Sequence, residues 1–478
     1  MSEQPPTEPT RGVFANRTLN LRSVQAIGYD MDYTLVHYNV DAWEQAAFEH
    51  ATKRLDELGW PVSGLTFDPD AFTLGLVFDL ELGNLVKATR FGYVVRAQHG
   101  TEVLDFPAQR AAYADTVVDL GEDRFEFMNT LFELSRAALF TELVQVHDAS
   151  PLPGVRSYFD LHRRIDEALG RAHVEGELKA EILANPARFI DPDPNLVQTL
   201  VDQRLAGKQL LLITNSDWAY TRQTMARVVD PSCAPGTTWR DLFDIVIVSA
   251  DKPRFFSDEK ALYRVVDEEQ SLLLPHYGPL EPGSVYFGGN AKLVERSLNL
   301  SNSQLLYVGD HLFGDVHVTK DTLRWRTALI ARELEAEIEG AADFEEDQVR
   351  LEALMGEKIA LDRRQAELRM ARRRHRADLG PKVDEVELAE IKSRGAALDD
   401  QIAPLARQAG LLGNSNWGPL MRAGNDKSLF ARQVEKYADV YMSRVSNLGL
   451  ETPYGYLRAA RGSLPHDSKA DLLSGASG

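Results

Sequence analysis

The sequence has little cysteine and no long apolar run. Cys233 is the single cysteine among 478 residues, which excludes an internal disulfide framework and any metal site built from several cysteines. No stretch approaches the roughly 18 consecutive apolar residues that a membrane span requires. Residues 1–6 are polar and proline-rich with no apolar stretch behind them, so no signal peptide is predicted. These absences together predict a cytoplasmic protein without a membrane partner.

Net positive charge is missing too. The chain has 72 acidic and 53 basic side chains and a formal net charge of −19. Nucleic acids and anionic membranes are polyanions, so this balance argues against general affinity for either and predicts no nucleic-acid partner. A local basic cleft is still compatible with it, and an enzyme that acts on phosphates needs one. The length predicts two or three domains, because one hydrophobic core rarely serves so long a chain.

Four short apolar runs predict strands that are buried on both faces, as in a parallel sheet. They are residues 23–30, 209–216, 242–250 and 304–310. Helix-like stretches such as 195–206 and 219–229 separate them, which predicts an α/β fold. All but the 242–250 run end on polar side chains, and ligands of such sheets bind beyond the carboxyl ends of the strands.

Two further regions interrupt this pattern. About 180 residues separate the first run from the second, so we expect an inserted domain, with helices in 41–59 and 155–185 and strands within 72–105. Between 344 and 410, leucines and an isoleucine recur every seven residues on both sides of a Gly-Pro break, which predicts an antiparallel helical hairpin of the coiled-coil type. These heptad positions are Leu354, Leu361, Leu368, Ile391, Leu398 and Leu405.

A basic run, residues 372–376, lies within the predicted hairpin. Such a run is typical either of nucleic-acid contact or of a solvated helix face. The solvated face is favoured, because acidic residues elsewhere in the hairpin offset the charge.

The first strand ends on a pair of aspartates, Asp30 and Asp32. Side chains at i and i+2 at a strand end point the same way, so beside a cation one can attack phosphorus while the other protonates the leaving oxygen. Asp-x-Asp pairs are also common in turns and calcium loops. The following Tyr33 and Thr34 strengthen the phosphohydrolase interpretation.

The second and third strands are followed by groups suited to a phosphate. The segment Thr214, Asn215 and Ser216 offers hydroxyl and backbone N–H groups before a helix, which suit phosphate oxygens; the alternative is a simple helix N-cap. Lys252 is placed to offset the charge of a transferring phosphoryl group; the alternative is a surface lysine.

The fourth strand is followed by Asp310 and Asp315, within residues 309–315. Hard carboxylate ligands with open coordination positions suit Mg²⁺, so a Mg²⁺ cofactor is predicted here. The alternative is a tight Gly-Asp turn.

The order Asp-x-Asp-x-Thr, Thr/Ser, Lys, Gly-Asp…Asp resembles the four-part signature of the haloacid dehalogenase-like phosphohydrolases. Residues 30–35 and 309–315 further resemble the cytosolic purine 5′-nucleotidases of the IMP/GMP-specific type. The similarity runs from about residue 14 to 461, with 344–410 least alike. Supporting stretches are 75–79, 83–85, 129–132, 252–256, 285–289, 325–327, 429–434 and 437–439.

The resemblance implies a Rossmann-like parallel sheet core with an inserted mixed cap domain, and the heptad pattern adds a helical coiled-coil hairpin. The predicted division is a disordered leader (1–11), a phosphohydrolase core (12–40, 190–343 and 411–461), a cap (41–189), the hairpin (344–410) and a flexible tail (462–478). We also expect a homo-oligomer, either a dimer or a tetramer.

The resemblance also implies catalytic roles. Asp30 would attack the 5′-phosphate and form a phosphoaspartate, and Asp32 would protonate the ribose oxygen and then activate water. Mg²⁺ would be held by Asp30, the backbone carbonyl of Asp32 and Asp310, with Asp315 in support. Thr214, Asn215 and Ser216 would grip the phosphate and Lys252 would neutralise it. Because the reaction has two displacements, a nucleoside hydroxyl can replace water, which predicts phosphotransferase activity as well.

The base pocket is implied by the same similarity. Phe132 matches an aromatic residue that stacks on the purine, and Glu133 stands where the family has an amide, which changes the purine edges that can be recognised. The family also has an Arg and an Asp on one helix face, which Arg163 and Glu167 match. Beyond a short insertion, His173 and Lys179 match a His and a Lys of the family.

The family's effector site is half matched. Asn129, Gln433 and Tyr437 correspond to it, but Asp119 replaces an expected arginine, so activation by ATP-like effectors is not expected. The predicted function is hydrolysis of IMP- or GMP-like monophosphates. One alternative is a phosphatase for another small phosphomonoester. Another is a dead phosphatase that presents the hairpin to a partner, which the intact catalytic set argues against.

Overall fold

The computed structural model describes the backbone of residues 10–174 and 177–462, and their side chains except those of residues 171–174. The predicted disordered leader and flexible tail therefore lie almost entirely outside the described residues. The chain divides into two compact units. One comprises residues 1–335 and 420–478, and the other comprises residues 336–419.

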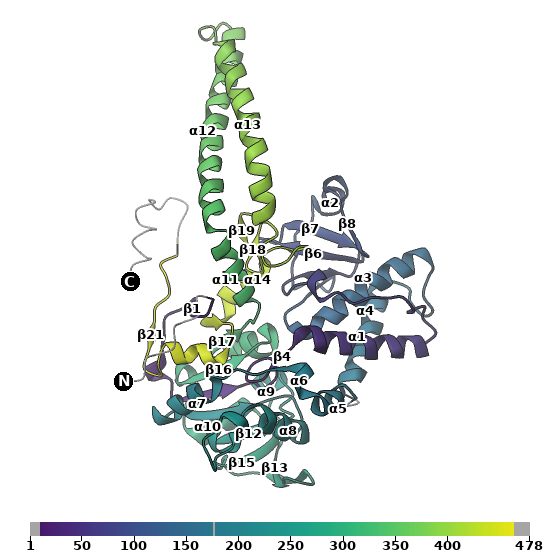
Figure 1. Ribbon diagram of the computed structural model, residues 1–478, viewed down its shortest axis with the longest axis vertical. Coiled ribbons are helices and arrows are strands. Elements are labelled where there is room, and N and C mark those ends of the chain that lie inside the picture. Colours follow the sequence, from purple (N-terminus) through teal and green to yellow (C-terminus); the bar gives the residue numbers. More distant parts are fainter. Residues whose placement is uncertain (1–9, 175–176, 463–478) are drawn as a thin grey trace. The chain divides into compact units, whose positions relative to one another are not determined.

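A mixed sheet forms the centre of the larger unit (Figure 1). Among the described residues it has ten strands, in the order β1-β20-β17-β16-β3-β11-β12-β15-β13-β14. Neighbours from β20 to β15 pair in parallel, and the outer strands are antiparallel. The bounds are β1 Val13–Ala15, β20 Val440–Met442, β17 Arg326–Ile330, β16 Leu305–Gly309, β3 Ala26–Tyr29, β11 Gln209–Ile213, β12 Ile245–Val248, β15 Ser284–Gly288, β13 Leu262–Asp267 and β14 Leu272–His276.

The prediction of an α/β fold with a parallel sheet is confirmed. All four predicted runs contribute a strand to the sheet, and β3, β12 and β16 are buried at every position. The predicted helices between them are α7 (Leu196–Leu205) and α8 (Trp218–Val228). Burial on both faces explains the continuous apolar runs, since no strand position is left for a polar side chain before the strand ends.

The segment between residues 38 and 190 leaves the main sheet and returns to it at one place. Strand β4 (His37–Tyr38) pairs antiparallel with β10 (Ile190–Asp191), and Tyr38 is opposite Ile190. The two crossings of the chain are therefore neighbours. We call residues 39–189 the inserted segment.

The inserted segment contains a second, antiparallel sheet, in the order β8-β7-β6-β5-β9. Helices α1, α3 and α4 pack on one another beside it. The predicted helix at 41–59 is α1, whereas the predicted helical region 155–185 contains two helices, α4 and α5. The bounds are β5 Val77–Asp79, β6 Asn84–Ala88, β7 Val94–His99, β8 Glu102–Val103, β9 Phe125–Phe127, α1 Val40–Glu57, α2 Phe106–Tyr113, α3 Leu134–Ala149, α4 Tyr158–Val174, α5 Glu177–Ala184 and α6 Pro186–Phe189.

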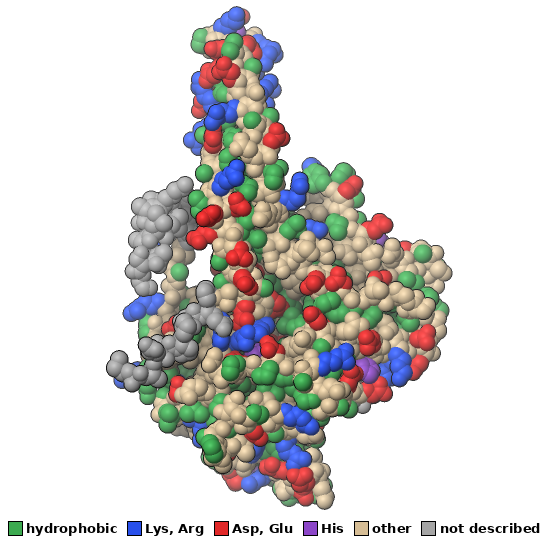
Figure 2. All heavy atoms as spheres, in the orientation of Figure 1, with side chains coloured by type: hydrophobic (Ala, Val, Ile, Leu, Met, Phe, Trp, Pro, Cys, Tyr) green, Lys and Arg blue, Asp and Glu red, His purple; other side chains and the backbone are tan. Residues whose placement is uncertain are grey.

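The smaller unit contains two long helices, α12 (Glu345–Arg376) and α13 (Glu385–Ala409). Ion pairs such as Lys358–Asp399 (2.7 Å) and Arg364–Glu387 (2.7 Å) show that the helices run antiparallel. Acidic and basic side chains are interspersed along both helices (Figure 2). Of the predicted heptad positions, Leu368, Leu398 and Leu405 are buried, and Leu354, Leu361 and Ile391 are half-buried.

Across residues 10–174 and 177–462, no helix is both long enough and apolar enough to cross a bilayer. The division of the larger unit into a core and a cap stays a prediction, as does the homo-oligomeric state.

One buried acid joins two helices of the inserted segment. Glu44 of α1 is fully buried, and its Oε2 accepts a hydrogen bond from the backbone N–H of Ser135 at the start of α3 (2.7 Å). Burial raises the pKa of Glu44 to about 7. Its other oxygen, Oε1, has no hydrogen-bond partner among the described residues.

The free energy of unfolding should fall less between pH 5 and pH 8 in Glu44→Gln than in wild type. A carboxyl whose pKa is raised in the folded state contributes stability at low pH, and this contribution is lost as the pH rises through the folded pKa of about 7. The amide keeps the acceptor for Ser135 and does not ionise. Urea denaturation should therefore show a pH-dependent loss that is smaller by about 2 kcal/mol. Glu57→Gln, an exposed change on the same helix, should behave as wild type. Equal pH profiles for Glu44→Gln and wild type would contradict the assignment.

Candidate active site

The polar residues predicted at the strand ends converge at the carboxyl edge of the main sheet. Strand β3 pairs with both β11 and β16, with Tyr29 opposite Leu212 on one side and Val308 on the other. The backbone N–H of Asp30 donates to the carbonyl oxygen of Val308 (2.9 Å). Asp30 therefore lies between the loop that follows β11 and the loop that follows β16.

Lys252 lies among the carboxylates of the site. Its Nζ is 2.8 Å from Asp30 Oδ2, 2.8 Å from Asp315 Oδ1 and 3.0 Å from the hydroxyl oxygen of Tyr307. Burial lowers the pKa of Lys252, but the charges of Asp30 and Asp315 outweigh burial and hold that pKa well above its ordinary value. The lysine is therefore a buried ammonium ion, and the surface-lysine alternative is wrong.

A third carboxylate, Asp310, lies beside the two that contact this ammonium. Oxygens of Asp30, Asp310 and Asp315 all lie within 4.8 Å of one another. Burial raises the pKa of Asp30 to about 7, although Lys252 lowers it, and burial with the charges of Asp30 and Asp315 raises the pKa of Asp310 well above its ordinary value. A set made only of carboxylates, with negative charge in excess, suits a hard divalent cation.

Local packing fixes the two acidic residues after β16. Thr130 Oγ1 donates to Asp310 Oδ2 (3.0 Å). Asp315, on the π-helical turn η7 (Leu312–His317), accepts a hydrogen bond at Oδ2 from the backbone N–H of His311 (3.2 Å). A Cβ on Gly309 would collide with the Asp315 carboxylate, so a glycine is required before Asp310.

Both oxygens of Asp32 accept hydrogen bonds from hydroxyl groups. Tyr38 Oη donates to Oδ1 (2.6 Å) and Ser216 Oγ donates to Oδ2 (2.7 Å). Tyr220 Oη lies 3.0 Å from Tyr38 Oη, which extends the chain of hydroxyls. The Asp32 carboxylate therefore has a fixed orientation. Tyr33, directly after it, has a left-handed φ of 51°, a strained conformation that is often found at functional sites.

The segment after β11 does not cap the next helix. The N-cap of α8 is Asp217, whose side chain accepts from the N–H of Tyr220 (2.9 Å), so the N-cap alternative for Thr214, Asn215 and Ser216 is wrong. The Asn215 carboxamide instead binds the backbone of Lys252, since Oδ1 accepts from its N–H (2.6 Å) and Nδ2 donates to its carbonyl oxygen (3.1 Å). Asn215 thus positions Lys252. Thr214 Oγ1 accepts from the N–H of Ser216 (3.0 Å).

Two substrate-side predictions lie next to this centre. Phe132 lies on the turn η3 (Leu131–Glu133), which follows Thr130. Its ring centroid is 4.5 Å from that of Tyr33. Lys179 of α5 reaches Ser216, with 3.3 Å from Nζ to Oγ. Both residues come from the inserted segment.

The other substrate-side predictions are placed differently. Glu133 is buried, and its Oε2 accepts from the backbone N–H groups of Asn129 (2.6 Å) and Thr130 (3.5 Å), as in a helix capping box. The Glu133 carboxylate thus accepts hydrogen bonds from the backbone, because Glu133 is the third residue of the turn. Arg163 and Glu167 are exposed on α4 and pair with Asp160 and Arg164 of that helix. The His173 side chain lies outside the described residues. The base-binding roles of all four stay predictions.

Tyr38, Thr130 and Tyr307 belong to the site but do not stand out in the sequence. Tyr307 lies inside the fourth apolar run, and its hydroxyl donates to the carbonyl oxygen of Ile213 (3.0 Å). Thr130 lies in the inserted segment, far along the chain from Asp310, and Tyr38 lies beside that segment, outside the Asp-x-Asp motif that it contacts. A tyrosine within a buried strand that ends at the site is the one available signal.

The residues matched to an effector site line one cavity of about 810 Å³. Asn129, Gln433 and Tyr437 are in its wall, and so is Asp119, the residue that replaces the expected arginine.

Comparisons with known proteins agree with the motifs. The model of the 5′ nucleotidase family matches residues 13–469. A 5′-nucleotidase domain-containing protein of Dictyostelium discoideum is 26% identical over 479 residues, which cover 97% of this chain and 76% of that protein. The human 5′-nucleotidase domain-containing protein 2 is 27% identical over 458 residues, which cover 91% of this chain and 81% of that protein.

Among solved structures, an archaeal β-phosphoglucomutase from a hyperthermophilic Pyrococcus is similar at 10% identity, with a TM-score of 0.30 over 64% of this chain and 86% of that chain. The family match extends over nearly the whole sequence. The chain therefore belongs to the 5′ nucleotidase family and is a hydrolase of the 5′-nucleotidase type.

Proposed function

We propose that the chain is a Mg²⁺-dependent 5′-nucleotidase that hydrolyses purine monophosphates of the IMP and GMP kind through a phosphoaspartate on Asp30. The observation that carries the proposal is the group of Asp30, Asp310 and Asp315 beside the Lys252 ammonium, at the carboxyl edge of the sheet, in which Asp30 and Asp315 are buried and Asp310 is half-buried. Hydrolysis of nucleoside monophosphates follows from the family. The metal, the base and the covalent step are the parts we propose.

The reaction takes two displacements. Asp30 attacks the 5′-phosphorus, a new P–O bond forms, and the bond to the ribose 5′ oxygen breaks while Asp32 gives that oxygen a proton. Water then attacks the phosphoaspartate, Asp32 takes its proton, and the bond from phosphorus to Asp30 breaks to release phosphate. The two hydroxyl donors on Asp32 support this role because they fix its direction. A nucleoside hydroxyl in place of water gives phosphotransferase activity.

Three groups of residues would support these steps. Asp30, the backbone carbonyl of Asp32 and Asp310 would hold Mg²⁺, with Asp315 beside them. When bound, this ion supplies positive charge against the developing charge on the phosphoryl oxygens. Thr214 and Ser216 would bind the phosphate, and Lys252, positioned by Asn215, would neutralise it.

For the substrate side, we propose a haloacid dehalogenase-type core whose specificity is set by residues 41–189. Thr130, Phe132 and Lys179 support this, because each of them reaches a residue of the site or its neighbour from the inserted segment. A phosphatase for another small phosphomonoester is the second candidate. The Glu133 carboxylate favours it, since that group caps a backbone turn and is not free to meet a base.

We expect Asp30→Asn to lower phosphate release from IMP by roughly a thousandfold or more, because an amide cannot act as the nucleophile. Acid-quenched wild type should carry phosphate on the chain, detectable by mass spectrometry, and the variant should carry none. Asp258→Asn, on the surface, serves as the matched control and should keep wild-type turnover. Wild-type turnover by Asp30→Asn would show that the covalent mechanism is wrong.

Tyr38→Phe should lower kcat for IMP about tenfold and leave KM within about twofold. The variant keeps the ring, whose centroid is 4.4 Å from that of Trp43, but removes the hydroxyl that donates to Asp32 Oδ1. Asp32 then keeps only the bond from Ser216, so its carboxylate is less firmly oriented while the substrate contacts stay the same. Tyr263→Phe, on strand β13 of the main sheet, is the matched control. A wild-type kcat in Tyr38→Phe would mean that the hydroxyl does not act through Asp32.

Phe132→Ala should raise KM for IMP and GMP by about tenfold and leave KM for ribose 5-phosphate within about twofold, because the ring can stack only on a base. Phe132→Tyr, which keeps the flat surface, should stay close to wild type. Initial rates on a panel of monophosphates with Mg²⁺ check both statements. If wild type cleaves sugar phosphates faster than IMP or GMP, the second candidate replaces the first.

A further inference from the structure

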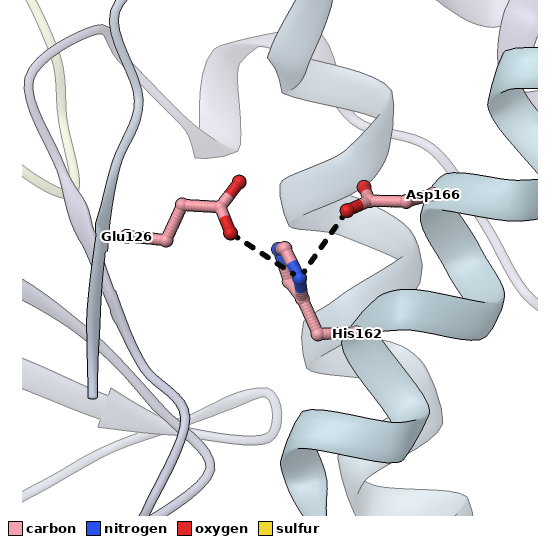
Figure 3. A group of neighbouring side chains, drawn as sticks. All are labelled: Glu126, His162 and Asp166. Atoms are coloured by element: carbon pink, nitrogen blue, oxygen red, sulfur yellow. Dashed lines mark ion pairs between the residues drawn. The ribbon is translucent and has the colours of Figure 1, made fainter. Parts of the chain in front are cut away.

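A second group of potential metal ligands lies in the inserted segment. Glu126 of β9 meets His162 and Asp166 of α4, which lie four residues apart on one helix face (Figure 3). The Nδ1 atom of His162 is 3.6 Å from Glu126 Oε2 and 3.5 Å from Asp166 Oδ2. All three ligand atoms lie within 4.8 Å of one another. None of these residues takes part in the proposed reaction.

Arg136 of α3 contacts the carboxylate oxygens of Glu126 and Asp166 that do not face His162. Its Nη1 donates to Glu126 Oε1 (2.6 Å), and its Nε is 3.0 Å from Asp166 Oδ1. Each carboxylate thus gives one oxygen to the arginine and turns the other toward the imidazole. Outer partners of this kind fix the direction of metal ligands.

The buried imidazole of His162 meets the two carboxylates only at ion-pair distances. The residue is 3% exposed and packs against the rings of Phe78 and Phe140, at centroid distances of 4.9 and 5.7 Å. Within the described part of the chain, Nε2 has no hydrogen-bond partner, and the distances from Nδ1 exceed those of normal hydrogen bonds. The Nδ1 atom therefore faces one oxygen from each of the two carboxylates.

The spacing fits a transition-metal ion. In a tetrahedral site with bonds of about 2.0–2.1 Å, ligand atoms lie about 3.4 Å apart, close to both distances from Nδ1. One imidazole and two carboxylates are typical ligands of Zn²⁺, whereas Mg²⁺ prefers oxygen ligands alone. Glu126 and Asp166 have side chains that are 41% and 37% exposed, so an ion can reach them from solvent.

We propose that Glu126, His162 and Asp166 form a second metal site, separate from the Asp30 cluster, which binds a divalent first-row transition ion and fits Zn²⁺ best. The three ligands leave a fourth position for water. The ion would join strand β9 to helix α4, two elements that the chain places more than 30 residues apart. The inference does not depend on the proposed reaction.

The test measures Zn²⁺ bound to the full-length chain. Protein freed of metal by chelation is dialysed against micromolar Zn²⁺ with excess Mg²⁺, and metal is counted by mass spectrometry. We expect one equivalent of Zn²⁺ in wild type and loss of at least tenfold in affinity in His162→Gln and in Asp166→Asn. The matched control is His50→Gln. His50 also meets two glutamates, but through different ring nitrogens, so they do not converge on one atom.

A second measurement identifies which site is filled and does not depend on a folded His162 variant. Co²⁺ in place of Zn²⁺ should give the strong visible absorption of a tetrahedral site. The band should persist in Asp310→Asn and disappear in Asp166→Asn, whose side chain is partly exposed and whose amide keeps the shape. The proposal is overturned if wild type binds no Zn²⁺, if Asp166→Asn binds as wild type does, or if Asp310→Asn removes the band.

Discussion

The structure of the site depends on the balance between the charge of one buried lysine and the charges of three aspartates around it. The Lys252 ammonium is shared by Asp30 and Asp315, and Asp310 is close enough to add its own charge. Removing ions from water costs several kcal/mol per ion unless they are paired. Each loop at the carboxyl edge must therefore hold its charged residue in contact with the others. The Asn215 side chain does this for Lys252, and Thr130 does it for Asp310.

The larger unit has two groups of potential metal ligands among its described residues, and the groups differ in their side chains and in the cation that pairs with them. We call them the Asp30 cluster (Asp30, Asp310 and Asp315) and the Glu126 cluster (Glu126, His162 and Asp166). The Asp30 cluster is made of carboxylates alone, and its cation is a lysine. The Glu126 cluster includes an imidazole, and its cation is an arginine that contacts only the outer oxygens of the carboxylates. The ligand softness of the two groups differs, so the metals that they would favour differ as well.

Much of the candidate active site is predictable from the sequence, because buried strands end where polar residues begin. Asp30, Lys252, Asp310 and Asp315 come together for that reason. The role of Asn215 is not predictable, since a carboxamide that binds the backbone of another loop leaves no mark in its own motif. The capping contacts of Glu133 are not predictable from its residue type either, because they depend on its position in a turn, where the carboxylate accepts from backbone N–H groups. The pairing of Arg163 and Glu167 with their own helix depends on rotation of α4, which spacing alone does not determine.

The β4–β10 ribbon has a consequence for how this protein can vary. The inserted segment departs and returns through two paired strands, so its ends are held a few ångströms apart by backbone hydrogen bonds. Such a junction allows lengthening, shortening or exchange of the segment without rethreading the main sheet. The exchange is not free, however, because Tyr38 stands within the junction itself and its hydroxyl contacts Asp32. Evolution can therefore replace what lies beyond residue 38 more readily than residue 38 itself.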